Sequence, residues 1–390
     1  MNAKDEMNIL IVAPFCSLPG EAYFNRFLYL AGFLSCDNSV TLATSSFRHF
    51  DKTHREKSKK IDCPFEVVLI DEPGYKKNIS LARVWSHWKF SRNFKSWMNG
   101  FFSRRKIDVV YSAYPLLETN ILLGKSKTEF GYKLIIDVQD VWPEAIAGAF
   151  PLVRKIPSCI TPFSRKANRA YSMADKLVAV SESYLRRAKR ANRGAKGLVA
   201  YIGSDACKIN STPARNLAND ERHFVYVGTI GHSYDLVTVV EAFSRFHVMG
   251  RKYRLHILGD GPGLSRIKKI SSAAVSFYGL VVYEEMIAIA KGADYLINPI
   301  KSSAMQSITN KLSDYILLGK PILSSQTNNE VVELLKNFPS TAYEAGNVSD
   351  FMKAADLMCS TEYAPSPRGL LDSFDRKVSY ERIKDFICLP

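Results

Sequence analysis

The chain has 390 residues, of which 46% are hydrophobic and 23% are charged. These proportions exclude a disordered chain, and the length predicts about two to three domains with cores of their own. The formal net charge is +15, and residues 1–205 carry 32 Lys and Arg against 19 Asp and Glu, so they hold most of the excess. A basic half joined to a near-neutral half predicts two modules with different partners. The basic module should face nucleic acid, an acidic membrane or a phosphorylated substrate.

Several classes of protein are disfavoured by what the sequence lacks. No apolar run approaches the roughly 18 residues of a membrane-spanning helix, and the short apolar run near the N-terminus has no signal-peptide cleavage site. The seven Cys are scattered without a C-x-x-C pair, which is typical of free thiols in a reducing cytoplasm. No metal-ligand spacing is found either, so no metal is expected. His49, His54 and His87 lie in polar or basic stretches and are interpreted as solvated surface residues.

The first half alternates between apolar strands and helices, which is typical of a doubly wound parallel sheet. A continuous apolar run predicts a first strand at 8–13, and a helix is expected over 23–34. Further strands are predicted at 39–43, 66–70, 108–111, 133–137 and 176–180.

A polar, aperiodic stretch over 206–222 predicts a linker. The alternation then restarts, with strands expected at 223–227, 254–258, 275–278, 295–297 and 321–324, and helices at 235–249, 264–270, 283–291, 310–318 and 329–336. We therefore predict an α/β protein with two tandem Rossmann-like domains facing across a cleft, with ligands at the carboxyl ends of the strands. The predicted domains are 1–205 and 206–365, and a helical segment over 366–390 is expected to pack back on the first domain.

Two glycine-rich turns follow strands of the second domain. The first is Y-V-G-T-I-G at 226–231, and the second is G-D-G-P-G at 259–263. Glycines at such places let a backbone approach a phosphate closely, although a plain structural turn explains the first motif almost as well. Neither turn is a G-x-G-x-x-G, and the first strand of the chain has no glycine fingerprint, so a nicotinamide-dependent oxidoreductase is disfavoured.

The segment over 301–323 carries the strongest chemical signal. Thr309 or Ser307 can cap a helix that starts near Asn310. The free N–H groups of that helix start and the Lys311 ammonium together predict an anion site. Asp314 lies one turn further on the same face, where its carboxylate can accept hydrogen bonds from a ribose diol. An ordinary amphipathic helix with a surface Asp–Lys pair is the alternative.

Five motifs stand in an order that resembles the donor domain of retaining GT-B glycosyltransferases of family 4. They are V-G-T-I-G, L-G-D-G-P, F-Y-G-L-V-V-Y-E-E-M, A-D-Y-L-I-N-P and N-K-L-S-D-Y-I-L-L-G-K-P-I-L. In the first half, I-D-V-Q-D-V-W-P-E resembles the segment at the base of that family's cleft, and the chain is most similar to bacterial capsule and O-antigen enzymes. The resemblance implies transfer of a sugar, with retention, from a nucleotide-diphosphate sugar to a lipid-linked or saccharide acceptor in surface polysaccharide biosynthesis. UDP-sugars are favoured over GDP-sugars, and no cofactor or metal is obligatory.

The resemblance also implies which residues act. Front-face attack needs positioning and charge stabilisation rather than a protein nucleophile. The residues implied to be catalytic are Gln139, Asp140 and Lys311. The implied acceptor-side residues are Gly20, Arg26 and Trp142. The implied donor-binding residues are Gly228, Thr229, Gly231, His232, Gly259, Asp260, Gly279, Gln306, Thr309, Asn310, Lys311 and Asp314.

The sequence departs from this family at three places. Gln306 and Asp314 replace the usual Glu-x7-Glu pair, Gln139 stands where the catalytic-loop His is usual, and the loop over 228–235 lacks the usual Arg and Lys. These departures leave open a weakly active or non-catalytic partner subunit. A GT-B sugar-nucleotide epimerase is also open, although clear catalytic carboxylates and histidines are missing.

Residues 73–107 explain part of the basic half. They hold nine Lys and Arg, no acid, and three of the four Trp. This composition predicts a helix at an anionic membrane surface. The residues expected to face the membrane are Trp85, Trp88, Trp97, Arg104, Arg105 and Lys106. Alternatively, the aromatic side chains pack into the core and the cations are merely solvated. The expected location is cytoplasmic and peripheral, on the inner face of the cytoplasmic membrane, and no nucleic-acid partner is expected because no such motif is present.

Overall fold

The computed structural model describes residues 6–21, 25–56, 61–77, 80–143, 162–218, 220–304 and 308–389. The chain divides into two compact units, Met1–Ala200 with Tyr380–Pro390, and Tyr201–Ser379. The first unit therefore ends five residues before the predicted boundary at 205 and takes back a short segment after residue 379.

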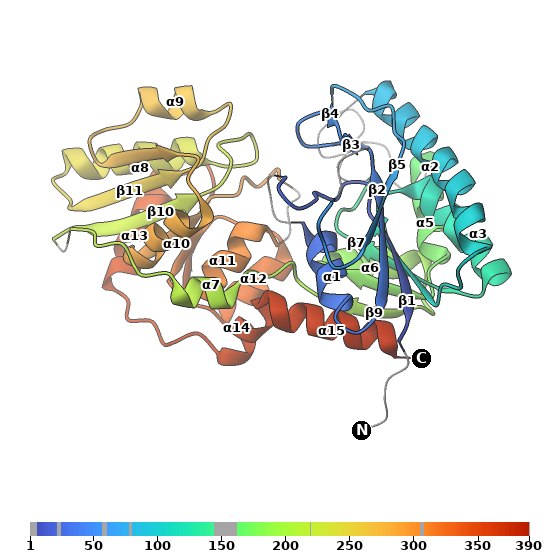
Figure 1. The fold of residues 1–390 in the computed structure, drawn as a ribbon. Helices are drawn as coiled ribbons and strands as arrows, with labels where there is room; N and C mark the ends of the chain where they lie inside the picture. Colours follow the sequence, from blue (N-terminus) through green and yellow to red (C-terminus); the bar gives the residue numbers. More distant parts are fainter. Residues whose placement is uncertain are drawn as a thin grey trace. The chain divides into compact units, whose positions relative to one another are not determined.

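The first unit is built on a seven-stranded sheet in the order β5-β2-β1-β6-β7-β8-β9 (Figure 1). The pairings along this sheet are all parallel. Its strands are β1 (Asn8–Val12), β2 (Ser39–Ser45), β5 (Glu66–Ile70), β6 (Val109–Tyr114), β7 (Lys133–Val138), β8 (Lys176–Ala179) and β9 (Lys196–Val199). A small antiparallel ribbon, β3 (Phe47–Arg48) with β4 (Thr53–His54), follows β2.

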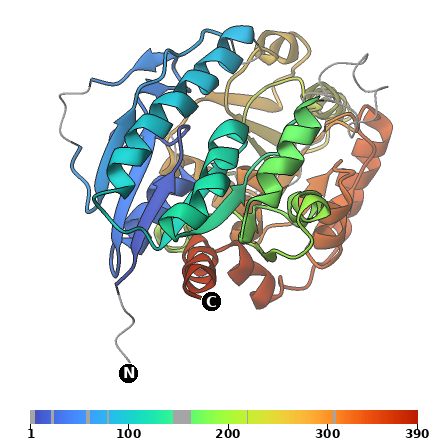
Figure 2. The same ribbon diagram turned by 90° about the vertical axis from the view of Figure 1, so that its right-hand side faces the viewer.

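Both faces of this sheet are covered by helices, as the continuous apolar strands require. Along β1, Leu10 belongs to one core and Ile11 to the other, because successive side chains point to opposite faces. The first core is covered by α2 (Leu81–Phe102), α3 (Leu117–Phe130), α5 (Pro162–Ser172) and α6 (Glu182–Ala191), of which Figure 2 shows α2, α3 and α5 side by side. The second is covered by α1 (Arg26–Leu34) and α15 (Arg376–Cys388).

The second unit has a six-stranded parallel sheet in the order β12-β11-β10-β13-β14-β15. The strands are β10 (Arg222–Val227), β11 (Tyr253–Leu258), β12 (Val275–Gly279), β13 (Tyr295–Asn298), β14 (Ile322–Ser324) and β15 (Ser340–Ala342). One face packs on α8 (Leu236–Val248), α9 (Leu264–Lys269) and α13 (Val348–Ser360). The other packs on α7 (Ala206–Ser211), α10 (Tyr283–Gly292), α11 (Asn310–Leu318), α12 (Asn329–Lys336) and α14 (Arg368–Phe374).

The doubly wound α/β prediction is confirmed for both units, and the predicted strands occur with ends shifted by a few residues. The expected linker is partly wrong, because α7 forms inside the polar stretch. Asp205 caps this short helix by accepting a hydrogen bond from Lys208 N at 2.9 Å, and Ile209 is buried in the core. No helix among the described residues is both long and apolar enough to cross a membrane.

Each sheet reverses its strand order once, between β1 and β6 in the first unit and between β10 and β13 in the second. At such a reversal the connections leave toward opposite faces of the sheet, which opens a crevice at the carboxyl ends of the strands.

Candidate functional site

Three adjacent strands of the second unit end on glycines with positive φ. Gly228, Gly259 and Gly279 follow or end β10, β11 and β12 with φ of +133°, +142° and +68°. The turns are hydrogen-bonded to one another, since Gly228 N donates to Leu258 O at 2.9 Å and Gly259 N donates to Gly279 O at 2.7 Å. A Cβ on Gly259 would lie only 2.0 Å from Gly228 O, so the two turns are packed too closely for a side chain at this position.

The loop after β10 continues this backbone-lined edge. Ile230 N donates to Asp260 O at 2.9 Å, while the Asp260 carboxylate accepts from Gly261 N at 2.7 Å and so holds its own turn. Thr229 and His232 are exposed, and Gly231 is half-buried. The predicted donor residues of the two glycine-rich turns thus lie together, with two polar side chains open to solvent.

The same loop is fixed to the loop after β13, across the point where the strand order reverses. Tyr234 forms an antiparallel bridge with Ile300, and Lys301 N donates to Ser233 O at 3.0 Å. Asp235 N donates to Pro299 O at 2.9 Å. The crevice of the second unit is therefore bordered by two connected loops.

Lys311, in the first turn of α11, lies against this border. Its side chain is buried, with 8% exposed, and its Nζ lies 3.7 Å from the centre of the Tyr234 ring and 4.6 Å from that of Tyr226. No described residue offers this Nζ a hydrogen bond. Burial holds the pKa of Lys311 well below its usual value. This buried amine therefore lies between two ring faces and has no ion-pair partner among the described residues, which leaves its capacity for an anion unfilled.

Side chains at the start of α11 also have polar atoms without a described hydrogen-bond partner. Thr309 occupies the N-cap position, but its side chain makes no capping hydrogen bond, which corrects the predicted role of that hydroxyl. Within the described part of the chain, Thr309 Oγ1 and Ser313 Oγ are buried without partners. Asn310 is exposed. Gln306 and Ser307 lie outside the described residues.

Asp314 is buried, with 9% exposed, and accepts a hydrogen bond from Tyr283 Oη at 2.7 Å. Burial raises the pKa of Asp314 above its usual value, against the opposing effects of Ser204, Tyr283 and Arg376. The alternative of a surface Asp–Lys pair on this helix is therefore excluded, because both residues are buried and Lys311 has no ion-pair partner among the described residues.

In the first unit, the predicted acceptor residues follow two strands on either side of β6. Gly20, after β1, is exposed with φ +80°. After β7, Gln139 is half-buried and its Nε2 has no described partner, while Asp140 is exposed and accepts a bond from Val141 N at 2.8 Å. Trp142 is half-buried, and its ring meets Phe163 edge-on at 5.1 Å.

Arg26 is a structural residue and not an acceptor-side one. It is only 3% exposed, and its Nε donates to Asp137 Oδ2 at 2.7 Å. Tyr111 Oη donates to the same carboxylate oxygen at 2.6 Å. Burial opposes the charge of Arg26, but Asp137 raises the pKa of Arg26 above its usual value, so the guanidinium stays charged. An acceptor cannot reach a guanidinium enclosed in this way.

A cluster of histidines corrects a second expectation. His49 and His87 are half-buried, not solvated, and lie with the buried Glu72 so that one N or O atom of each lies within 4.8 Å of the others. The sequence analysis missed this cluster because its residues are far apart in the chain. The pairing of β2 with β5 could have indicated it, because the segments after neighbouring parallel strands lie close together.

The residues predicted to face a membrane divide into two groups along α2. Trp85 and Trp88 are 50% and 42% exposed, whereas Trp97 is half-buried and stacks on Phe101 at 4.5 Å. Arg104, Arg105 and Lys106 follow the other end of the helix, about 28 Å from Trp85 at the helical rise per residue. These aromatic and cationic side chains therefore do not form one patch.

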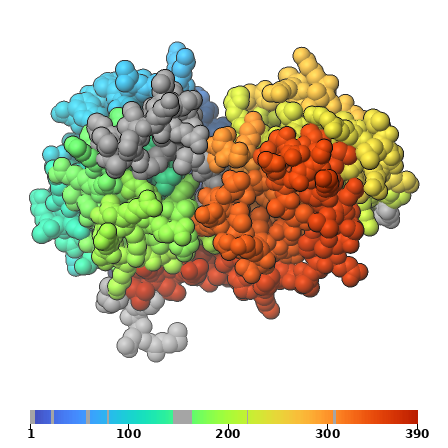
Figure 3. Space-filling model, turned by 180° about the vertical axis from the view of Figure 1, so that it is seen from behind, coloured from blue at the N-terminus to red at the C-terminus, as the bar shows by residue number. Residues whose placement is uncertain are grey.

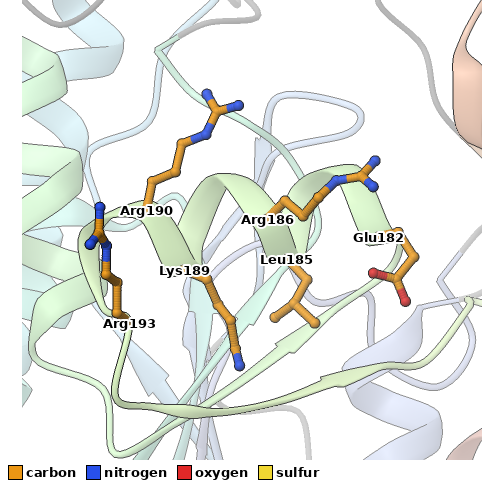
Figure 4. Close-up of a pocket in the computed structure, with 6 residues that line it drawn as sticks. All are labelled: Glu182, Leu185, Arg186, Lys189, Arg190 and Arg193. Carbon is orange, nitrogen blue, oxygen red and sulfur yellow. The ribbon is translucent and has the colours of Figure 1, made fainter.

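A second basic surface lies on α6 and the residues after it. A shallow hollow is lined by Glu182, Leu185, Arg186, Lys189, Arg190 and Arg193, and Figure 4 shows the four basic side chains spreading from this helix. Figure 3 shows the segment in green on one face of the first unit. Its cations line one hollow, which the sequence alone does not reveal.

Comparison with known proteins agrees with this geometry. Residues 221–360 match the family model described as glycosyl transferases group 1. No curated protein matches the chain in sequence.

Three solved structures have the same fold at low sequence identity. The lipopolysaccharide outer core galactosyltransferase WaaB is 16% identical, covering 98% of this chain and 99% of its own, with a TM-score of 0.64. The E. coli trehalose-6-phosphate structure bound with UDP-2-fluoro glucose is 12% identical, with the same coverage and a TM-score of 0.68. A putative UDP-N-acetylglucosamine 2-epimerase from Listeria monocytogenes is 10% identical, covering 98% and 96%, with a TM-score of 0.57.

These likenesses confirm the predicted GT-B fold, with its two Rossmann-like units. The expectation of an enzyme of the glycosyltransferase class is confirmed by the domain over 221–360. The glycine turns and Lys311 lie in this matched region, and so the candidate site falls within the residues that match the glycosyl transferases group 1 model.

Proposed function

We propose that the protein is a retaining glycosyltransferase that uses a nucleotide-diphosphate sugar. The observation that supports this best is the buried Lys311 Nζ, which has no described counter-ion at the point where the strand order of the second sheet reverses. A diphosphate there meets a cation, and the glycine turns leave room for close approach to the backbone.

The chemistry follows from this placement. The acceptor hydroxyl attacks the anomeric carbon on the face from which the diphosphate departs. The bond from that carbon to the diphosphate oxygen breaks, and the diphosphate takes the hydroxyl proton. Lys311 and the backbone amides near Gly231 stabilise the developing negative charge. Gln139 and Asp140 orient the acceptor, and no metal is needed in this scheme.

The remaining donor contacts are proposed from the residues of the same edge. Asp314 holds the ribose diol, and this requires its carboxylate to exchange or share the hydrogen bond with Tyr283. Gln306 contacts the sugar hydroxyls. UDP is the proposed nucleotide, which is supported by the UDP-sugar in one structure of the same fold.

For the acceptor we propose a lipid-linked saccharide of bacterial surface polysaccharide synthesis, reached by a protein bound peripherally to the inner face of the membrane. The support is the charge of the first unit. Four cations surround the α6 hollow, and Trp85 and Trp88 are exposed on α2 beside further cations. Such surfaces favour anionic headgroups.

The test is calorimetric titration of the full chain with UDP, GDP and their sugars, followed by product analysis with and without acceptor. Tighter binding of a nucleotide diphosphate than of the monophosphate, and transfer to a saccharide with retained configuration, are expected. No nucleotide binding would contradict the donor site and favour a partner subunit.

An epimerase is the second candidate, because one solved structure of the same fold carries that description. The two activities differ in their products. An epimerase changes the sugar nucleotide in the absence of any acceptor, whereas a transferase releases the nucleotide diphosphate and consumes the acceptor.

A further inference from the structure

The cluster of His49, Glu72 and His87 lies at the carboxyl edge of the first sheet. His49 follows β2, Glu72 follows β5, and His87 is in the second turn of α2. Phe15, which follows β1, meets the His49 and His87 rings at 4.4 Å and 5.4 Å. Three neighbouring strands thus bring these side chains to the edge where such sheets bind ligands.

Glu72 has little capacity left for a ligand. Its side chain is fully buried, and it accepts hydrogen bonds from Ser45 Oγ at 2.6 Å and Ser86 Oγ at 2.7 Å, and contacts His49 Nε2 at 3.1 Å. Burial would raise the pKa of Glu72, but these contacts lower it to about 2. The carboxylate is therefore an ionised structural anchor whose oxygens are already occupied.

His49 is held at both ring nitrogens. Its Nδ1 lies 2.9 Å from Tyr75 Oη, while its Nε2 faces Glu72. Because the carboxylate can only accept, Nε2 carries the proton and Nδ1 accepts from the tyrosine. Burial lowers the pKa of His49, so the ring is neutral at pH 7.

His87 differs from His49 at one of its ring nitrogens. Its Nε2 is buried and has no hydrogen-bond partner among the residues that the structure describes. Burial lowers the pKa of His87 to about 4, so this ring too is neutral. Tyr75 meets it at 5.9 Å, and with Phe15 it fixes the position of the ring. In the tautomer that carries its proton on Nε2, this ring offers an unused N–H donor.

Two cations complete the cluster. The Arg83 guanidinium, one turn before His87 on α2, lies 5.5 Å from the centre of the Tyr75 ring and 6.0 Å from that of Phe15. Lys52 lies on the segment after β2, and its Nζ is 4.5 Å from the centre of the Tyr75 ring. Both cations lower the pKa of His49, which indicates that their fields reach the cluster. The Asp51 carboxylate also acts on Lys52 but is paired with Arg48, so among the described residues the two cations outweigh Glu72 and the local charge is positive.

We propose that His87, Arg83 and Lys52 bind an anionic phosphate or diphosphate group of the acceptor substrate. His87 Nε2 donates to a phosphate oxygen, Arg83 and Lys52 supply the opposite charge, and Glu72 with His49 keeps the site rigid. This inference rests on the proposed function, in which the first unit binds the acceptor.

A divalent metal is the competing occupant, because His and Glu side chains are common metal ligands. A metal would have to compete with the hydrogen bonds that Glu72 already accepts, and it would lie beside the cations Arg83 and Lys52. The arrangement therefore favours an anion.

The experiment follows the ring nitrogens of 15N-His-labelled full-length protein by NMR, which needs no catalytic turnover. Inorganic phosphate and pyrophosphate are the probes, and the seven His signals are assigned by single His→Gln substitutions. The His87 and His49 signals should shift with saturation, while exposed His247 in α8 should not. A response to Zn²⁺ alone, or no response to either anion at millimolar concentration, would overturn the proposal.

Matched variants test the charge. Arg83→Gln should weaken pyrophosphate binding by about tenfold or more, whereas Lys95→Gln, which removes an exposed cation from the same helix, should not. Thermal unfolding checks that both variants fold, and His87→Gln gives a second loss if Arg83→Gln is unstable. Equal binding by all the variants contradicts the assignment.

Two further probes identify the source of the anion. A stronger shift with geranyl diphosphate indicates a lipid-linked acceptor, and one with glucose 6-phosphate indicates a free sugar phosphate. UDP titration of the same samples reports the Lys311 site, which lies in the other unit. A failure of the donor site and a failure of this cluster are thus seen separately.

Discussion

Lys311 Nζ lies 3.7 Å from the centre of the Tyr234 ring, and Tyr234 in turn is bridged to Ile300 in the loop after β13. The cation is thereby joined to both loops that border the crevice of the second unit. A buried amine without a counter-ion destabilises a fold. Lys311 has none among the described residues, so we expect it to serve a ligand rather than stability.

Replacing Lys311 should separate binding from stability. Lys311→Met is expected to lower affinity for a nucleotide diphosphate by about tenfold to a hundredfold, since a hydrogen bond to a charged group contributes roughly 1.5–3 kcal/mol. The free energy of unfolding should stay equal or rise, because an apolar side chain replaces a buried amine. Calorimetry and urea unfolding measure the two effects. Lys353→Met, at an exposed position of α13, is the control, and equal affinity in both variants would refute the donor role.

Asp314 and Tyr283 should respond differently. Asp314→Ala removes the acceptor of the Tyr283 hydroxyl and should lower the free energy of unfolding of the second unit by about 3 kcal/mol. It should also weaken nucleotide-diphosphate binding. Tyr283→Phe should lower stability by only about 1 kcal/mol and leave affinity unchanged or higher, since the carboxylate becomes available to the ribose. Equal losses of affinity in both variants would mean that Asp314 acts only by supporting Tyr283.

The glycine edge gives a third prediction. Gly259→Ala places a Cβ 2.0 Å from Gly228 O at a φ of +142°, and should destabilise the second unit by roughly 3 kcal/mol while reducing donor binding. Gly369→Ala, in α14, meets no atom within 4 Å and should have little effect. Hydrogen exchange over β10 and β11 provides the measurement, and unchanged protection in Gly259→Ala would contradict the packing described for these turns.

His256 should make the second unit sensitive to acid. It is buried, its Nε2 lies 2.9 Å from His223 Nδ1, and burial lowers its pKa to about 4. In the unfolded chain its pKa is about 6.5, so the unfolded state binds the proton first. Stability contributed by the neutral ring is therefore complete above pH 6.5 and is lost as the pH falls toward 4, by on the order of 3 kcal/mol.

Hydrogen exchange over β10 and β11 at pH 7.5 and pH 5, corrected for intrinsic rates, reports this loss. His256→Gln should remove most of the pH dependence, whereas His247→Gln, at an exposed position, should not. A pH dependence that survives His256→Gln would exclude this residue as its source.

The basic hollow on α6 should contribute more to membrane binding than the residues after α2. Replacing Arg186, Arg190 and Arg193 by Gln should reduce co-sedimentation with anionic vesicles strongly, at about 1 kcal/mol for each cation near the surface. The corresponding triple variant of Arg104, Arg105 and Lys106 should have a smaller effect, because Arg105 pairs with Glu66 at 2.6 Å. A matched loss of three charges at Arg245, Lys336 and Lys353 is the control.

Local patterns were sufficient to predict most of the fold. Continuous apolar runs such as residues 8–13 predict buried parallel strands, and β1 has four fully or almost fully buried positions out of five. The alternation of strands and helices then predicts a doubly wound sheet. The short helix α7 was missed because it is stabilised by a cap and one buried apolar residue. Neither feature produces a helical pattern of apolar residues in the sequence.

The site was predictable only where its residues are close in the chain. The glycine turns and Lys311 lie next to strands and a helix start, so their sequence context indicates their location. Arg26 was assigned wrongly because its partner Asp137 is distant in sequence. From the sequence alone, an Arg in a buried ion pair cannot be distinguished from an exposed Arg. The His49–Glu72–His87 cluster depends on the segments after β2 and β5 and on the start of α2, and the first two segments meet only when β2 and β5 pair.

Helix α15 has a consequence for how the protein is made. Residues 201–379 form the second unit, while Tyr380, Ile383 and Phe386 return to the core of the first, where Lys176 Nζ also donates to Phe386 O at 2.9 Å. On the ribosome the whole second unit emerges before these residues do. The second unit can thus fold before the first is complete. Until α15 has been synthesised, the first unit keeps an exposed apolar face that chaperones can bind.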